Sequence, residues 1–395
     1  MKTVLFFLFA ALNFSAFAQF ADGYNKQEVR DMIALCNSFT FLDLYNSDTE
    51  IIPHGYEKIY TSGIFGMDNK YQIYRKGNMA VINLRGSTDK KASWLENINS
   101  AMIPAKGRMK ISGEYFQYCF AKDVNAAVHS GYALGIAFLS KDILYHIKSL
   151  NYEGVYHFII TGHSQGGSLA NMLRAYLENL TANEISKGNK FKTYSFAAPM
   201  VGNKNFTEEY NSLYAFNNTS FNIVNPDDAV PTFPLNYNNT DYMSDNLKTL
   251  FSNKESFSFK KMMSDGVVLL FENGITKSVK SFSTSVNKQI EKDLGPVELP
   301  PYVEDINYQR LESRIEIQPA VFPKMLKDSS ILKNETLMHM YMRDPNGDFY
   351  NEELYAKESW TYQHKPYNYY VSILKMYFPD EYALLRKKFL KENVE

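Results

Sequence analysis

The stretch at residues 157–170, HFIITGHSQGGSLA, constrains the fold of this chain more than any other. Its first half continues an apolar, β-branched run that predicts a buried strand, and its second half opens an amphipathic helix. The halves are joined by GHSQG, which fits the pattern G-x-S-x-G, where both glycines leave room for a sharp turn. Such a turn would raise the Ser164 hydroxyl above a sheet, at a helix N-terminus whose dipole favours negative charge. The pattern alone is weak, but this context favours a nucleophile over a glycine-rich turn without chemistry.

Strand and helix patterns alternate through residues 27–224. This alternation predicts an α/β fold with a mostly parallel central sheet that is covered by helices on both faces. In such sheets ligands bind at the carboxyl ends of the strands, where residues 85–87, the 162–166 turn and residues 227–228 would lie. We expect a loop at 102–112, strands at 56–60, 71–75, 79–84, 155–161, 191–196 and 220–224, and helices at 27–46, 93–99, 124–150 and 203–216.

The composition changes beyond about residue 234. Residues 236–246 are polar and rich in asparagine, and an apolar run at 262–271, MMSDGVVLLF, lies within a Lys- and Ser-rich helical stretch. We expect residues 236–335 to form a helical cap or insertion within a single domain that spans 19–395. The apolar run fits a lipid-facing lid, but a short run of this kind is more often a buried helix.

Residues 1–18 are typical of a secretory signal, with Lys2 before a short apolar region and an A-x-A motif that predicts cleavage after Ala18. No stretch is long and apolar enough to cross a bilayer, so we expect a secreted or periplasmic chain without a transmembrane segment. The formal net charge of −1 gives no attraction to nucleic acid or to an anionic membrane. Export allows a disulfide between Cys36 and Cys119, the only cysteines, while two buried free thiols are an equal alternative.

A serine nucleophile needs a base that takes its proton, a carboxylate that orients the base, and hydrogen-bond donors for the oxyanion. In chains with this kind of turn the order is Ser, Asp, His. Asp227 and Asp228 directly follow a predicted strand and are the carboxylate candidates. The neighbouring Pro226 would by itself explain a polar turn at this place.

Seven histidines are candidates for the base. His129 precedes the turn, which is the wrong order, and His163 is adjacent to Ser164, so the two side chains would point apart. His364 lies in a polar, aromatic loop just before a proline that suits the first position of a helix. His339 lies in an apolar context and is the weaker alternative. We therefore expect His364 to be the base.

The oxyanion donors are expected at two places. One is the backbone N–H of Gln165, the residue after the nucleophile, and the other comes from a neighbouring loop. Ser87, which follows Gly86, can donate its backbone N–H and also its hydroxyl. The alternative for this segment is a simple β-turn.

Four segments together resemble the class 3 (fungal-type) lipases, a branch of the α/β-hydrolases. They are LRGS at 84–87 followed by SWL at 93–95, VHSGY at 128–132, GHSQGG at 162–167, and APMVGN at 198–203 followed by NPDDAVP at 225–231. The resemblance implies the α/β-hydrolase fold, selects Asp228 as the triad aspartate and gives His129 a structural role. It also likens the HKPY segment that begins at His364, with Tyr370, to the closing segment of the family. The departures are Gln165, where the family has leucine, and a long distance from the aspartate to the histidine, which implies a large insertion.

These features predict a secreted, lipase-like serine ester hydrolase with the triad Ser164, Asp228 and His364 and an oxyanion hole at Ser87 and Gln165. By resemblance, its substrates are esters of acylglycerols or related lipids, which it would reach through transient contact with a lipid interface. The alternatives are a carboxylesterase, a feruloyl esterase or a phospholipase A1-like enzyme. In a different class, the chain would be a catalytically silent exported binding protein. The predicted mechanism requires no metal and no cofactor.

Overall fold

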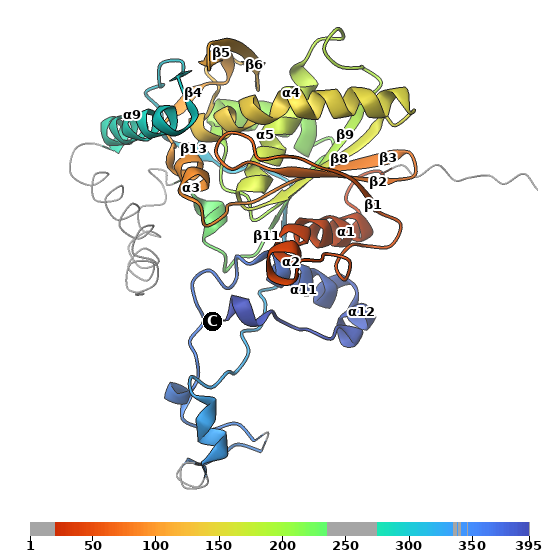
Figure 1. The fold of residues 1–395 in the computed structure, drawn as a ribbon, viewed down its shortest axis with the longest axis vertical. Helices are drawn as coiled ribbons and strands as arrows, with labels where there is room; N and C mark the ends of the chain where they lie inside the picture. The colour runs from red at the N-terminus through yellow and green to blue at the C-terminus, as the bar shows by residue number, and fades with distance from the viewer. Residues whose placement is uncertain (1–19, 235–274, 335–337, 339–340, 346, 395) are drawn as a thin grey trace, which may run out of the picture.

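A seven-stranded sheet forms the centre of the molecule (Figure 1). The computed structural model describes residues 20–234, 275–334, 338, 341–345 and 347–394. The strand order is β1 (Glu57–Thr61), β2 (Tyr71–Lys76), β3 (Met79–Leu84), β8 (His157–His163), β9 (Lys190–Phe196), β11 (Ser220–Val224) and β14 (Arg314–Glu316). The first three strands are antiparallel, and each pair from β3 to β14 is parallel. The predicted α/β-hydrolase fold with a mostly parallel sheet is therefore confirmed.

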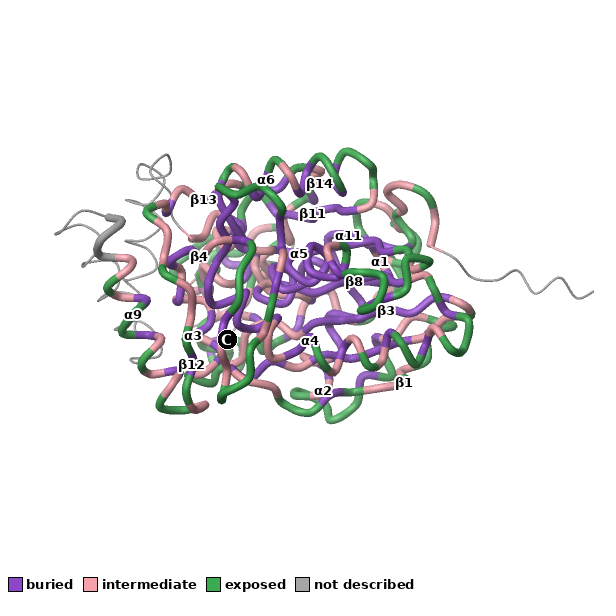
Figure 2. Tube along the Cα trace, turned by 90° about the horizontal axis from the view of Figure 1, so that it is seen from above, coloured by how far each residue is buried: buried purple, intermediate pink, exposed green. Residues whose placement is uncertain are grey.

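Helices cover both faces of this sheet. On one face Ile82 of β3 and Ile160 of β8 pack with α4 (Ser130–Tyr152) and α5 (Gln165–Asn179). On the other face the preceding residues, Val81 and Ile159, pack with α1 (Lys26–Cys36) and α11 (Pro366–Tyr377). Successive strand side chains point to opposite faces, so a continuous apolar run fills both cores. The strands accordingly run through the buried interior (Figure 2).

Two of the predicted helices are interrupted. The helix expected at 27–46 is two helices, α1 and α2 (Ser38–Tyr45), because the Asn37 side chain between them donates to the carbonyls of Ile33 at 2.9 Å and Pro366 at 3.0 Å. The helix expected at 203–216 is α6 (Lys204–Tyr210), which continues as a π-helical turn at Asn211–Ala215. The side-chain hydrogen bonds of Asn37 compete with a continuous helix, which explains the first break.

Two small sheets were not expected. The start of the helix predicted at 124–150 is the strand β7 (Ala127–His129), which pairs with β4 (Met102–Pro104) and with β10 (Gly202–Asn203), and β10 pairs with β13 (Tyr308–Gln309). The loop predicted at 102–112 is thus wrong as well, since it contains β4 and β5 (Lys106–Ile111). The strand β5 pairs with β6 (Glu114–Cys119) and with β12 (Val297–Glu298).

The segment after β11 is only partly described. Its helix α9 (Ile275–Leu294) lies beside α3 (Lys91–Ile98), and Ser283 of α9 accepts a hydrogen bond from the Ala101 N–H at 2.8 Å. The range predicted as a helical cap, 236–335, also contributes β14 to the edge of the central sheet. The apolar run at 262–271 and the predicted signal at 1–18 lie outside the described residues.

Between β14 and α11 the chain leaves the body and returns (Figure 1). This excursion, residues 318–363, has a small apolar cluster of its own around Ile331, Phe349 and Tyr355. The chain then forms α11 and α12 (Pro379–Leu384).

Cys36 and Cys119 are both free thiols. None of the helices in the described part of the chain is long and apolar enough to cross a membrane.

Candidate active site

Ser164 lies at the sharp turn between β8 and α5. Its backbone is strained, with φ 58° and ψ −129°, a conformation that non-glycine residues rarely adopt. The two flanking glycines are needed for close contact. A Cβ at Gly162 would lie 2.2 Å from the carbonyl oxygen of Gly166, and a Cβ at Gly166 would lie 2.2 Å from that of Leu84. The predicted strand-to-helix turn is therefore present, and it directs Ser164 away from the sheet at the start of a helix.

The structure brings Ser164, His364 and Asp228 together. His364 Nε2 lies 2.8 Å from Ser164 Oγ, and His364 Nδ1 lies 2.8 Å from Asp228 Oδ2. A carboxylate only accepts hydrogen bonds, so the imidazole proton belongs on Nδ1 and Nε2 is left to accept from the serine hydroxyl. Asp228 is buried, while the neighbouring candidate Asp227 is exposed. The arrangement has the hydrogen-bond pattern that activates a serine oxygen as a nucleophile.

The loop before His364 is held by its neighbour Gln363. The Gln363 Oε1 accepts from the Asn225 side chain at 2.7 Å and from the Ala320 N–H at 3.0 Å, while its Nε2 donates to the Ala320 carbonyl at 2.9 Å. Ala320 lies near the start of the excursion and Gln363 ends it, so these bonds hold its two ends together. Asn225 follows β11, so the same bonds tie the loop to the strand that carries Asp228.

Tyr369 is a member of the site that the sequence motifs did not identify. Its hydroxyl donates to Asp228 Oδ2 at 2.8 Å and accepts from the Asn225 N–H at 3.0 Å. Tyr370, the tyrosine that the resemblance included in the closing segment, packs with Tyr367 instead. Tyr369 lies on the buried face of α11 and Tyr370 is only partly buried, a difference that two adjacent tyrosines in the sequence do not reveal.

The other histidines have different surroundings. His129 is fully buried, which lowers its pKa to about 3, and its ring contacts the Asn97 carbonyl and the Tyr132 N–H. His163 is buried with its ring centroid 4.8 Å from that of His364, and burial followed by the nearby His364 holds the pKa of His163 well below its usual value. Both imidazoles are therefore neutral near pH 7. His339, the weaker candidate for the base, lies outside the described residues.

Ser87 and Gln165 flank the turn from two elements. The loop of Ser87 lies against the turn, because a Cβ at Gly86 would be 2.8 Å from the His163 carbonyl oxygen and 3.6 Å from Ser164 Cβ. No described residue accepts a hydrogen bond from the backbone N–H of Ser87 or of Gln165. The Ser87 hydroxyl, by contrast, donates to Gln165 Oε1 at 2.9 Å. Two unpaired N–H groups beside a serine hydroxyl can stabilise an oxyanion.

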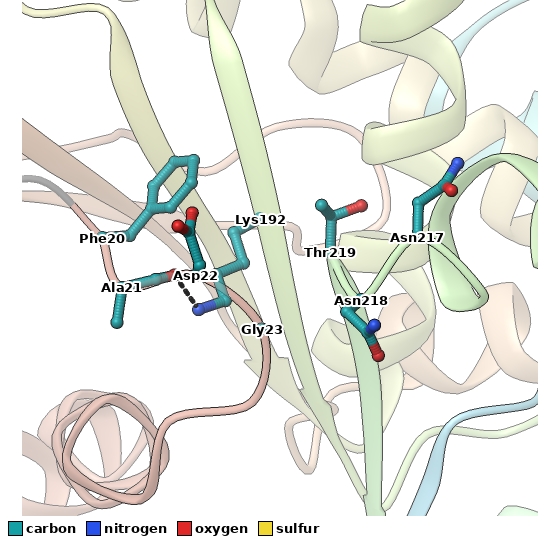
Figure 3. A pocket seen from close by; sticks show the side chains of 8 residues that line it. All are labelled: Phe20, Ala21, Asp22, Gly23, Lys192, Asn217, Asn218 and Thr219. Atoms are coloured by element: carbon teal, nitrogen blue, oxygen red, sulfur yellow. Dashed lines mark hydrogen bonds between the residues drawn. The ribbon is translucent and has the colours of Figure 1, made fainter.

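A separate cavity of about 460 Å³ lies at the opposite ends of the strands (Figure 3). It is lined by residues 20–23, by Lys192 near the start of β9 and by residues 217–219 just before β11. Ser164 and Asp228 follow the carboxyl ends of their strands, so this cavity is not part of the triad site. Its lysine is already paired, since Lys192 Nζ donates to the Ala21 carbonyl at 2.7 Å and to Glu28 at 2.6 Å.

The sheet order, the strained serine turn and the position of the site at the strand ends define the class of the protein, which is that of the α/β-hydrolases. Within that class, residues 81–238 match the family model described as Lipase (class 3). The resemblance to the class 3 lipases that the motifs predicted is confirmed over this segment.

Individual relatives are more distant or match over a shorter segment. A Caenorhabditis elegans protein named Lipase ZK262.3 is 33 % identical over 79 residues, which are 20 % of this chain and 21 % of that protein. The chain thus aligns with about a fifth of the length of this curated relative. Lipase II from Rhizopus niveus matches with a TM-score of 0.39 and 18 % identity, over 54 % of this chain and 77 % of that chain. A Rhizomucor miehei triacylglyceride lipase matches with a TM-score of 0.40, 18 % identity and the same coverage.

Proposed function

We propose that this chain is a lipase-like serine ester hydrolase with the triad Ser164, His364 and Asp228. His364 Nε2 takes the proton of Ser164 as the serine oxygen attacks the ester carbonyl carbon. The carbonyl oxygen becomes an oxyanion that accepts hydrogen bonds from the backbone N–H groups of Ser87 and Gln165. Asp228 keeps the imidazole in the required tautomer and stabilises the imidazolium.

The proton then passes from His364 to the leaving alcohol as the ester C–O bond breaks, which leaves an acyl group on Ser164. A water molecule attacks this acyl-enzyme after giving its proton to His364. Collapse of the second tetrahedral intermediate releases the acid and returns the proton to the serine oxygen. His364 donates each proton that it accepts within the same half of the cycle, so the triad returns to its starting protonation state. No atom changes its oxidation state, so the reaction needs no redox partner.

The observation that carries this proposal is the unbroken chain of hydrogen bonds from Ser164 Oγ through His364 to Asp228, with both distances at 2.8 Å. The test is hydrolysis of a short-chain nitrophenyl ester by the wild-type protein and by Ser164→Ala and His364→Ala. We expect each variant to lose at least about 10³-fold in kcat. Ser285→Ala, an exposed serine of α9, is the matched control and should retain full activity. Undiminished turnover by Ser164→Ala would contradict the proposal.

A fluorophosphonate probe provides a second measurement that does not depend on the choice of ester. The probe reacts covalently with an activated serine oxygen, so we expect stoichiometric labelling at Ser164 and none in Ser164→Ala. His364→Ala should label much more slowly because the base is missing. A catalytically silent binding protein on this fold would not be labelled.

The proposed substrates are esters of acylglycerols or related lipids, which the match of residues 81–238 to the class 3 lipases supports. A panel of triglyceride, phospholipid and feruloyl esters would distinguish this substrate class from the phospholipase, carboxylesterase and feruloyl esterase alternatives. We expect the highest kcat/KM on an acylglycerol. Ser164→Ala, assayed on each ester, corrects for uncatalysed hydrolysis.

We also propose that the chain is exported and that its leader is removed after Ala18, on the basis of the signal pattern at residues 1–18. Expression of the full chain followed by mass measurement of the exported protein tests this directly. The mass should correspond to a chain that begins at Gln19. A full-length product inside the cell would contradict this part of the proposal.

A further inference from the structure

The side chain of Gln165 lies at the centre of a buried polar network beside the turn. Gln165 is 2 % exposed, and three donors converge on its Oε1. They are Ser87 Oγ at 2.9 Å, Ser93 Oγ at 3.0 Å and Asn97 Nδ2 at 3.0 Å. A leucine at position 165 would offer no acceptor to any of them. The side-chain amide of Gln165 therefore has a hydrogen-bonding role that is separate from that of the backbone N–H of the same residue.

The Ser87 hydroxyl has one proton to donate, and its hydrogen-bond partners determine which acceptor receives it. Asn97 Nδ2 donates to Ser87 Oγ at 2.9 Å, and the hydroxyl itself donates to Gln165 Oε1. Asn97 Nδ2 also donates to the Ser93 carbonyl at 3.2 Å, and because a carbonyl only accepts, this bond fixes which end of the Asn97 amide faces the serine. Because the proton of Ser87 is directed to Gln165, it is not directed to a substrate oxygen.

The orientation of the Gln165 amide is also fixed from its other end. Gln165 Nε2 donates to Asn69 Oδ1 at 3.3 Å, and Asn69 Nδ2 donates to Glu96 Oε2 at 2.6 Å. Rotating the Gln165 amide by 180° would face its NH₂ group toward Asn97 Nδ2 and its oxygen toward Asn69 Oδ1. Buried polar groups placed in this way are destabilising, so the acceptor oxygen stays on the side of Ser87.

We propose that the Gln165 side chain is a positioning group that holds the Ser87 hydroxyl as an anchor, so that the oxyanion is bound by the backbone N–H groups of Ser87 and Gln165 and not by that hydroxyl. The inference rests on the proposed function, because it concerns the oxyanion of the same reaction. It assigns the two groups of Ser87 different roles. The N–H has no acceptor among the described residues and is left for the oxyanion, while the hydroxyl joins the loop of Ser87 to the start of α5.

A double-mutant cycle with kcat and KM on a soluble nitrophenyl ester tests this division of roles. Loss of one oxyanion donor typically lowers kcat by about 10²–10³-fold, whereas loss of an anchor should lower it less than about tenfold. We therefore expect Ser87→Ala to lower kcat less than tenfold with little change in KM. A loss of tenfold or more would overturn the proposal.

The second arm of the cycle uses Gln165→Leu, which removes the acceptor and frees the Ser87 hydroxyl to turn toward the oxyanion. In that background Ser87→Ala should lower kcat at least about ten times more than in the wild type, since it now removes a donor. In the conservative variant Gln165→Glu an acceptor oxygen remains, and the effect of Ser87→Ala should again stay below tenfold. An equal or smaller effect in the leucine background would overturn the role of Gln165.

Thermal unfolding shows which of these variants are folded. If Gln165→Leu does not fold, Ser87→Ala in the wild type decides the question alone. The results that would contradict the role of Gln165 differ from those that would contradict the proposed function. A wild-type protein without turnover and without fluorophosphonate labelling at Ser164 contradicts the function itself. A wild-type protein that is active, with Ser164→Ala inactive and Ser87→Ala reduced by about 10²-fold, contradicts only the role of Gln165.

Discussion

The hydroxyl of Tyr369 lies 2.8 Å from Asp228 Oδ2, the same carboxylate oxygen that faces His364. The other oxygen of Asp228 accepts from the Val230 N–H at 2.9 Å. Both oxygens of a buried carboxylate are therefore fixed by three donors, which come from His364, Tyr369 and Val230. A carboxylate fixed in this way keeps one orientation, and it holds the His364 imidazole in one orientation as well.

Tyr369→Phe should therefore disturb both activity and stability. The change leaves the Asn225 N–H without its acceptor and removes one donor from Asp228, so we expect the free energy of unfolding to fall by about 1–3 kcal/mol. We expect kcat to fall about tenfold, which corresponds to about 1.4 kcal/mol of transition-state stabilisation. Urea unfolding and ester hydrolysis measure the two effects. Tyr370→Phe is the matched control, because its hydroxyl has no hydrogen-bond partner among the described residues; equal effects of the two changes would refute the role of Tyr369.

Gln363 closes the base of the excursion directly beside His364, so its removal should loosen both. Gln363→Ala removes the shorter acceptor of the buried Asn225 amide and both side-chain partners of the Ala320 backbone, and we expect it to lower the free energy of unfolding by about 2–3 kcal/mol. Limited proteolysis with mass mapping should show faster cleavage within residues 318–363. Gln289→Ala on α9, whose side chain bonds to Asp293 of the same helix and to no other described residue, should leave the cleavage pattern unchanged. Unaltered cleavage in Gln363→Ala would show that the excursion is held by other contacts.

Glu96 makes the stability of the protein depend on pH. Burial raises the pKa of Glu96 from its ordinary value of 4.5 to about 8, so the folded protein holds this proton where the unfolded chain releases it. The contribution of Glu96 to the free energy of unfolding is thus fully present below about pH 4.5 and is lost as the pH rises to about 8.

Glu96→Gln removes this titration. We expect the free energy of unfolding of the variant, relative to that of the wild type, to be higher at pH 9 than at pH 4 by a few kcal/mol. Urea unfolding of both proteins at several pH values gives the difference curve, in which groups common to both cancel. Ser285→Ala changes an exposed residue that carries no titratable group and should give a flat difference curve. A flat curve for Glu96→Gln would mean that Glu96 is ionised in the folded protein.

Local patterns identified the elements that build the site, and long-range pairing explains most of what they missed. The turn at Ser164 is specified by a strand, two glycines and a helix that are contiguous, so it could be predicted. By contrast, Ala127–His129 forms a strand only because Met102–Pro104 and Gly202 lie beside it. No pattern within the segment indicates those partners, and its apolar residues also fit a helix.

The roles of polar side chains were the hardest to predict. Gln165 was recognised as a departure from the family pattern, but a single residue type does not show which donors will surround it. Tyr369 and Tyr370 are adjacent and chemically equal, and only the rotation of α11 against β11 decides which of them reaches Asp228. A histidine beside Ser164 could be predicted, because the chemistry needs a base. No local pattern in the sequence indicated the excursion between Asp228 and His364.

Lys192 and Glu28 form a buried ion pair between β9 and α1, far from the triad (Figure 3 shows Lys192). Lys192 Nζ lies 2.6 Å from Glu28 Oε2, and the Tyr194 hydroxyl donates to the same oxygen at 2.7 Å. Burial holds the pKa of Lys192 below its usual value, because desolvation outweighs the opposing effect of the hydrogen bond to the Glu28 carboxylate. Removing one partner of such a pair leaves an uncompensated charge in the interior.

Lys192→Met should therefore lower the free energy of unfolding by about 3–5 kcal/mol, and Glu28→Gln should also be destabilising. The double variant Lys192→Met/Glu28→Gln removes both charges, so it should be more stable than Lys192→Met alone. Lys204→Met breaks an exposed pair with Glu208 on α6 and should change the free energy by less than about 1 kcal/mol. Urea unfolding measures all four proteins. If the double variant is as unstable as the sum of the two single changes, the pair is not coupled, and the loss in Lys192→Met reflects packing of its aliphatic chain instead.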